Sequence, residues 1–132
     1  MKLTEENYVQ LAEEAIKELR KDEEKKSRGN NIQLVTTSKI RNLLAMTADI
    51  YNDVINSQKE QLSKNIVGRI NYMKIHFVYE AGREEKVRAL MEKAEILEHL
   101  DEIQGNRTQY ILFSRYMEAL VAYRKFYGGK DE

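Results

Sequence analysis

Residues 108–127 read TQYILFSRYMEALVAYRKFY, and their apolar side chains recur at intervals of three and four residues. This spacing is typical of an α-helix. One row along the helix comprises Leu112, Tyr116, Ala119, Tyr123 and Phe126. A second row comprises Tyr110, Phe113, Met117, Leu120 and Arg124. A helix with two such sides either lies at the centre of a bundle or is half covered by another chain, and both alternatives stay open for this segment.

Four further helices are predicted before this one, each from a periodic apolar row. They span about residues 4–26, 38–55, 59–81 and 84–104. Thr36, Thr37 and Ser38 are capping residues at the start of the second helix, and residues 27–31 are predicted to form a loop. Gly82 and Gly105 are predicted to end the third and fourth helices. The third helix also carries apolar residues opposite its main row, for which burial at the centre of the bundle is expected: Tyr72, Ile75 and Tyr79.

The sequence therefore predicts an all-α fold, a compact bundle of about five helices in a single domain spanning residues 1–132. The chain of 132 residues has no Pro and only 6 Gly, so few positions force a helix to break. We find no internal repeat. The short connections favour antiparallel neighbours.

No motif for catalysis is present. The chain has no Cys, no phosphate-binding glycine loop and no paired-histidine zinc motif. His76 and His99 lie on different predicted helices and are too few to hold a metal ion. We therefore expect neither enzymatic activity nor a cofactor. No stretch approaches the roughly 20 apolar residues of a membrane span, and a cytoplasmic location is expected.

The charge balance bears on possible ligands. The chain has 22 basic and 22 acidic residues, whereas nucleic-acid binders usually carry excess positive charge. Any contact with RNA therefore depends on a local patch. Lys39 and Arg41 form one candidate, because cations at a helix start oppose the helix dipole whereas a phosphate there would bind both the cations and free N–H groups. The alternative is that both are ordinary surface cations.

A second candidate patch lies on the third predicted helix. Arg69, His76 and Arg83 are spaced by seven residues, which returns to nearly the same helix edge about 10.5 Å further along. Such a row is suited to successive phosphates, and Tyr72 beside it is suited to stacking on a base. The alternative is a solvated row with Tyr72 in the core. Arg107 and Arg115 are further candidates on the last helix.

Three stretches together carry a family resemblance. They are TTSKIRNLL at residues 36–44, FVYEAGRE at 77–84, and FSRYMEALVAY followed by KFYGGKD within 113–131. In this order and spacing they resemble the small subunit of the type III-A CRISPR–Cas interference complex, the Csm complex. The resemblance implies a non-catalytic helical protein that stacks in several copies beside the backbone and large subunits. It also implies contact with the target RNA as it pairs with the guide RNA.

The resemblance also suggests which residues contact RNA. Lys39, Arg41, Arg83 and Arg115 lie inside the matching stretches and are expected to bind the RNA backbone, and Arg69 joins them on helix geometry. Any of them is alternatively a structural ion pair, Arg83 most readily because of its acidic neighbours. The other reading of the whole protein is a structural spacer without an RNA role. In that case polar substitutions at Tyr116 or Tyr123 would disrupt assembly.

Overall fold

The structure is a computed structural model, and it describes residues 1–28 and 32–128. Residues 29–31 of the predicted loop lie outside the described part of the chain. The same holds for residues 129–132, which include the end of the third family stretch.

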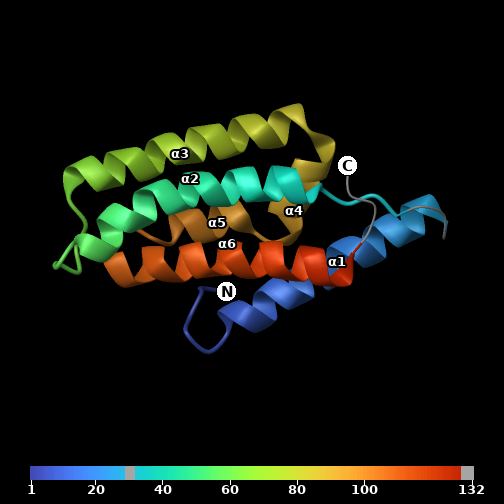
Figure 1. Ribbon diagram of the computed structural model, residues 1–132, viewed down its shortest axis with the longest axis horizontal. Coiled ribbons are helices and arrows are strands. Elements are labelled where there is room, and N and C mark those ends of the chain that lie inside the picture. Colours follow the sequence, from blue (N-terminus) through green and yellow to red (C-terminus); the bar gives the residue numbers. More distant parts are fainter. Residues whose placement is uncertain (29–31, 129–132) are drawn as a thin grey trace.

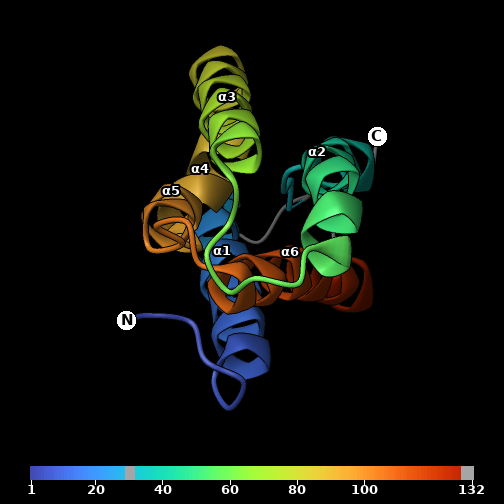
Figure 2. The same ribbon diagram turned by 90° about the vertical axis from the view of Figure 1, so that its left-hand side faces the viewer.

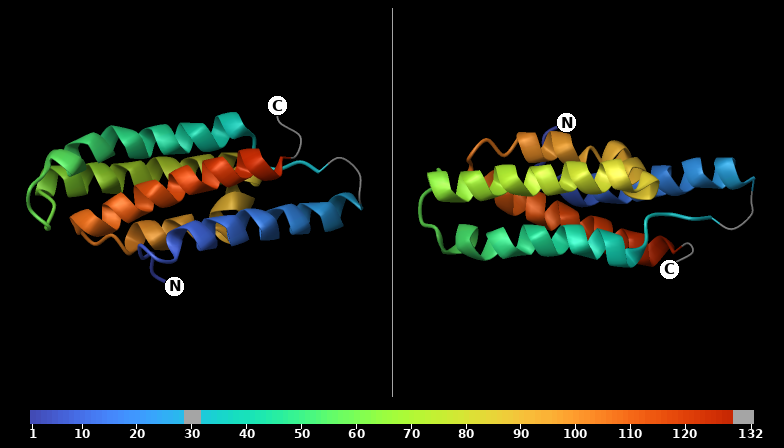
Figure 3. Two further views of the ribbon diagram at one scale, coloured as in Figure 1. Left: turned by 60° about the horizontal axis from the view of Figure 1, so that its bottom comes forward. Right: turned by 90° about the horizontal axis from the view of Figure 1, so that it is seen from above.

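The predicted all-α fold class is confirmed. The described residues form the helices α1 (Tyr8–Ser27), α2 (Thr37–Asn56), α3 (Lys64–Arg83), α4 (Glu85–Lys93), α5 (Ile96–Asp101) and α6 (Arg107–Tyr127). α6 lies between α1 and α2, running parallel to α1 and antiparallel to α2 (Figures 1 and 3). α3 lies antiparallel to α2 at one edge of the bundle, with α4 and α5 below it (Figures 1 and 2). None of these helices has an apolar stretch long enough to cross a membrane.

Both apolar rows of residues 108–127 face the protein interior over most of their length. Tyr110, Phe113, Met117 and Leu120 are fully buried, and so are Leu112 and Tyr116 of the other row. The Tyr116 hydroxyl donates a hydrogen bond of 2.8 Å to the Ala94 carbonyl, so burying it leaves no polar atom unsatisfied. Internal burial is therefore the correct alternative for α6, except at its end, where Phe126 is 77% exposed.

Arg124 is the one charged member of these rows, and it is also buried. Its Nε donates to the Val35 carbonyl at 2.7 Å and its Nη1 to the Gly128 carbonyl at 3.0 Å. The guanidinium thus joins the segment before α2 to the end of α6. A buried arginine is tolerated because hydrogen bonds to its N–H groups offset part of its desolvation cost.

The expected burial of both sides of the third helix is wrong. The main row of α3 is buried, at Ile66, Ile70, Met73 and Phe77. On the opposite side, Tyr72 and Ile75 are each 63% exposed and Tyr79 is 62% exposed. The reason is positional: α3 lies at the edge of the bundle, and no described element covers its outer side (Figure 2).

The predicted fourth helix, residues 84–104, is in fact two helices. Ala94 ends α4, and Glu95 adopts a left-handed conformation with φ of 51° before α5 begins. Left-handed backbone is uncommon for a residue other than glycine, and the sequence carries no Gly or Pro there. α5 is followed by Gln104 and Gly105, which also have positive φ.

Other helix ends differ from the predicted ones by a few residues. α3 begins later than residue 59, because the Ser63 hydroxyl caps it by accepting from the Ile66 N–H at 3.2 Å. It also passes through Gly82 and ends at Arg83. α1 begins at Tyr8 rather than residue 4, because Thr4 and Asn7 form a turn with reciprocal hydrogen bonds.

Burial changes what a substitution at Tyr116 is expected to do. Tyr116→Ser removes a buried ring and leaves a cavity, which should lower the free energy of unfolding by about 3–5 kcal/mol. Tyr79→Ser, on an exposed ring, should change it by less than about 0.5 kcal/mol. Urea denaturation followed by circular dichroism measures both, and equal effects would contradict the packing of α6.

Candidate nucleic-acid interface

An open groove separates α2 from α3. Its walls are largely apolar and enclose about 460 Å³. It is lined by Met46, Asp49, Ile50, Lys64, Asn65, Gly68, Arg69, Tyr72, Met73 and His76. A hollow of about 290 Å³ shares Met46 with it and continues between the same helices to Lys39 and Glu80. We call these two hollows together the α2–α3 groove.

The groove lies between two helices that pack against each other. On α2, Ile50 and Val54 turn towards the core, while Asp49 and Asp53 lie on the side that faces α3. The antiparallel arrangement places the start of α2 beside the end of α3 (Figure 3). Charged residues far apart in sequence are therefore neighbours at both ends of the groove.

Arg69 and His76 line the same groove, as their seven-residue spacing predicts. Arg69 is ion-paired with Asp53, and its Nη2 donates to the Asp49 carbonyl at 3.2 Å. These contacts hold the guanidinium at the edge of the groove, where it is still more than a third exposed. Tyr72 stands between the two residues, with its ring 4.7 Å from the His76 ring and nearly perpendicular to it. Tyr72 is therefore an exposed aromatic ring and not a core residue.

Arg83, the third member of the predicted row, does not line the groove. It forms an ion pair of 3.5 Å with Glu80, one turn earlier on α3. This is the kind of local pair that its acidic neighbours predict. Half of the Arg83 side chain remains exposed, and an exposed pair of this type contributes about 0–1 kcal/mol.

Lys39 and Arg41 point in different directions. Two residues correspond to about 200° around a helix. Lys39 lines the groove and lies 3.2 Å from a carboxylate oxygen of Glu84, whereas Arg41 is exposed and makes no ion pair with residues 1–28 or 32–128. The capping residues at the start of α2 are also only partly available to an anion. The Thr36 hydroxyl accepts from the Lys39 N–H, and Thr37 is buried.

The two arginines of α6 lie away from the groove. Arg115 is 3.2 Å from Glu5 in the N-terminal segment, on the side of the molecule opposite α3 (Figure 1). Arg107 donates to the Val54 and Ile55 carbonyls, both at 3.1 Å. These carbonyls lie in the last turn of α2, beyond which no helical N–H groups follow. The Val54 carbonyl also accepts from the Ser57 N–H at 3.1 Å. Arg107 is thus a C-terminal cap for α2.

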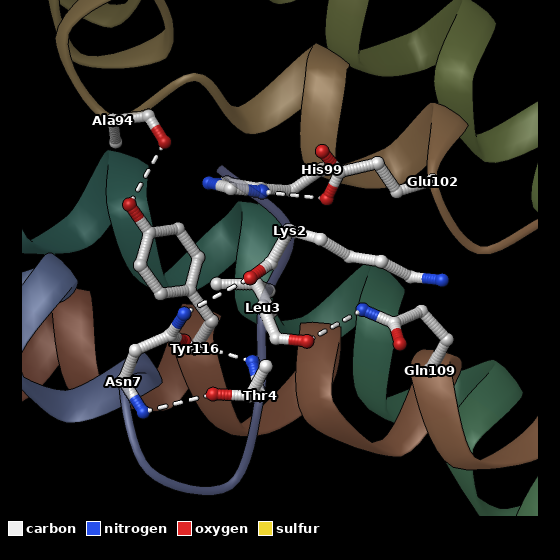
Figure 4. Close-up of polar contacts among 9 residues, drawn as sticks. All are labelled: Lys2, Leu3, Thr4, Asn7, Ala94, His99, Glu102, Gln109 and Tyr116. Carbon is white, nitrogen blue, oxygen red and sulfur yellow. Dashed lines mark hydrogen bonds and ion pairs between the residues drawn. The ribbon is translucent and has the colours of Figure 1, made fainter.

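His99 lies in a different, buried environment (Figure 4). Its Nδ1 is 3.1 Å from a Glu102 carboxylate oxygen, and its ring packs edge-on against Tyr116. Nearby, Gln109 donates to the Leu3 carbonyl at 3.0 Å and fixes the N-terminal segment against α6. Burial raises the pKa of the Tyr116 hydroxyl, which therefore stays a neutral donor. Within the described residues, no three His, Asp or Glu side chains are arranged to hold a metal ion.

Sequence reasoning identified Arg69, Tyr72 and His76 on the α3 side of the groove, but only Lys39 on the α2 side. Met46, Asp49 and Asp53 carry no motif, and their role depends on which side of α2 meets α3. Gly68 was also not identified, although a glycine inside a helical pattern often has a packing or functional reason.

Comparison with known proteins identifies the family to which the chain belongs. The family model described as Csm2 Type III-A matches residues 7–130. The chain is 49% identical over 129 residues to the CRISPR system Cms protein Csm2 of Streptococcus thermophilus, covering 98% of each chain. It is 34% identical over 132 residues to the protein of the same name from Mycobacterium tuberculosis strain H37Rv, covering both chains completely. A third relative of that name, from Enterococcus italicus, is 41% identical over 95 residues, which is 70% of this chain and 68% of the relative.

These matches assign this small all-α protein, with its open groove between two helices, to a defined CRISPR protein family. The chain belongs to the type III-A Csm2 family, the small subunit of the type III-A CRISPR complex. The family resemblance carried by residues 36–44, 77–84 and 113–131 is confirmed.

The assignment of Arg107 to a structural role can be tested. Arg107→Ala removes two hydrogen bonds from a charged donor to the end of α2, and should lower the free energy of unfolding by about 1–3 kcal/mol. Arg41→Ala should change it by less than about 0.5 kcal/mol, because Arg41 is exposed. Urea denaturation of the two variants gives the comparison, and a stability change for Arg41→Ala as large as that for Arg107→Ala would contradict it.

Proposed function

We propose that this protein is a non-catalytic subunit that stacks in several copies within a cytoplasmic type III-A CRISPR complex. In this role it contacts the backbone of the target RNA and of its duplex with the guide RNA, without reading sequence. The observation that carries the proposal is the arrangement of α2 and α3. Four of the five candidate cations lie on this helix pair, and two of them, Lys39 and Arg69, line one open groove.

The ion pairs of these cations do not argue against a phosphate ligand. Lys39, Arg69 and Arg83 have carboxylate partners, and each cation remains at least one-third exposed. Exposed pairs contribute about 0–1 kcal/mol, so exchanging a carboxylate for a phosphate costs little. The carboxylates also keep the free subunit close to neutral. Binding then depends on several copies acting together along one strand, which multiplies weak contacts.

Contacts to phosphates are independent of base sequence. This suits a subunit that must accept any guide and target, because base pairing between the two RNA strands supplies the sequence recognition. Arg115 lies on the other side of the molecule, beside Glu5. If it contacts RNA, it meets a different segment of the strand or the part bound by a neighbouring copy.

Reversing charge at the start of α2 tests the proposal. Lys39→Glu combined with Arg41→Glu should weaken capture of target RNA by the assembled complex about tenfold at low salt. It should also reduce the slope of log affinity against log salt concentration by roughly one for each residue replaced, because each replacement removes about one phosphate contact. Filter binding at several salt concentrations measures both quantities.

The matched control reverses the same number of charges on α1. Lys21 and Lys25 are exposed, and Lys21→Glu with Lys25→Glu should leave RNA capture within about twofold of the parent. If both double variants capture RNA equally well at every salt concentration, the proposed phosphate contacts at α2 are wrong.

A specific observation favours a packing role in addition. Ile75, Val78 and Tyr79 form an exposed apolar surface, which we call the outer face of α3. Contiguous apolar surfaces of this kind commonly mark protein–protein contacts. We propose that the outer face of α3 packs against another subunit of the complex.

Charged substitutions on the outer face of α3 should impair assembly without changing the fold. Ile75→Glu with Val78→Glu should leave the helical circular dichroism spectrum unchanged, because both side chains are exposed, but should reduce co-purification with the other subunits at least fivefold. Val9→Glu on α1, which also replaces an exposed valine, is the control and should co-purify normally. Normal incorporation of the double variant would exclude this face.

A further inference from the structure

The α2–α3 groove has properties that phosphate binding alone does not require. Phosphates bind to cations and N–H groups, whereas Met46, Ile50 and Met73 give this groove apolar walls. The hollow that these residues line has a volume of about 460 Å³, within the roughly 300–1,000 Å³ typical of small-molecule sites. The edge of this hollow carries Lys64 and Arg69 together with Asp49. Apolar walls beneath these two cations suit a ligand that is flat at one end and anionic at the other.

Tyr72 supplies an aromatic surface at the mouth of the groove. Its ring is 63% exposed, although an aromatic ring of this size is usually largely buried in a core or an interface. His76 packs against it nearly at a right angle, which fixes the ring without enclosing it. Stacking of a base on such a ring is worth about 1–3 kcal/mol and tolerates any base, because each base has an aromatic face.

Gly68 is the third feature. It lies inside α3, in the second turn, where glycine costs about 1 kcal/mol relative to alanine. Packing does not explain it, because a Cβ at this position would meet nothing within 4 Å. Gly68 does line the groove, one turn before Tyr72. Its missing side chain leaves open the approach to the groove beside that ring.

We infer that the α2–α3 groove receives an unpaired nucleobase of the RNA strand, which stacks on Tyr72 while the adjoining phosphate lies near Arg69 and Lys64. The inference rests on the proposed function, because it takes RNA as the ligand. It adds a contact to the base and therefore applies where the strand is single-stranded or where a nucleotide leaves the duplex. A side chain of a neighbouring protein would fit the apolar walls, but it would not account for the basic residues at the edge.

The test uses variants that leave every candidate phosphate contact in place. Gly68→Leu places a side chain at the mouth of the groove and should raise helix propensity, so the variant should fold at least as well as the parent. Tyr72→Ala removes the stacking surface. Gly82→Leu is the matched control, because Gly82 is the other glycine of α3, also has open space around it, and lies outside the groove.

Fluorescence anisotropy of the full chain with labelled single-stranded RNA at low salt measures the Kd. Gly68→Leu and Tyr72→Ala should each raise the Kd about fivefold or more, which corresponds to the lower end of base-stacking energies. Gly82→Leu should stay within twofold of the parent. For an RNA of the same length with abasic sites, all four proteins should bind equally, because only phosphate contacts remain.

The outcomes distinguish this inference from the proposed function. If Lys39→Glu with Arg41→Glu weakens binding but Gly68→Leu and Tyr72→Ala do not, the phosphate contacts stand and the base site is wrong. If Gly68→Leu weakens binding to intact and abasic RNA equally, the base site is also wrong. If Gly68→Leu leaves RNA binding intact but abolishes co-purification with other subunits, the groove binds protein instead. A parent chain that binds neither RNA on its own contradicts the base site, whereas the phosphate contacts of the proposed function are tested separately in the assembled complex.

Discussion

Burial of α6 on both sides is the constraint on which the remaining structure depends. Its two apolar rows require partners on two sides, and α1 and α2 provide them. The polar atoms buried in the process are satisfied locally: the Tyr116 hydroxyl by the Ala94 carbonyl, and the Arg124 guanidinium by the Val35 carbonyl. Because these hydrogen bonds run to loops and helix ends, packing around α6 also fixes where α2 begins and where α4 ends.

The position of α3 follows from this arrangement. With α1 and α2 placed against α6, α3 packs against one side of α2 and against the short helices α4 and α5 (Figure 2). It buries one row and leaves the other exposed. Both surfaces proposed to be functional therefore lie on the edge helix, with the α2–α3 groove on one side and the outer face of α3 on the other. The exposed side of an edge helix can bind an RNA strand or another subunit, because packing of the core uses only the opposite side of that helix.

Electrostatics limits what the free subunit does. The chain has no net charge, and most candidate cations are already paired with carboxylates of the same helix or of a neighbouring element. Such pairs are weak and exchangeable, and under the proposed function RNA binding comes from repeated contacts in an assembly. The sequence predicted the Arg69–His76 row. Helix geometry alone separates Lys39 from Arg41 by about 200°, but only the placement of α2 against α3 decided that Lys39, and not Arg41, lines the groove.

The sequence by itself determined the helical class, most helix boundaries to within a few residues, and the family, because local periodicity, capping residues and motif spacing are properties of neighbouring residues. It could not reveal the break at Glu95, where packing imposes a left-handed backbone on a residue that does not favour one. Only the tertiary structure decided which apolar sides are buried, since Tyr116 and Tyr72 both belong to periodic rows and yet one is core and the other surface. The physical reason is that burial depends on which element is available to cover a side, and that is fixed by long-range packing.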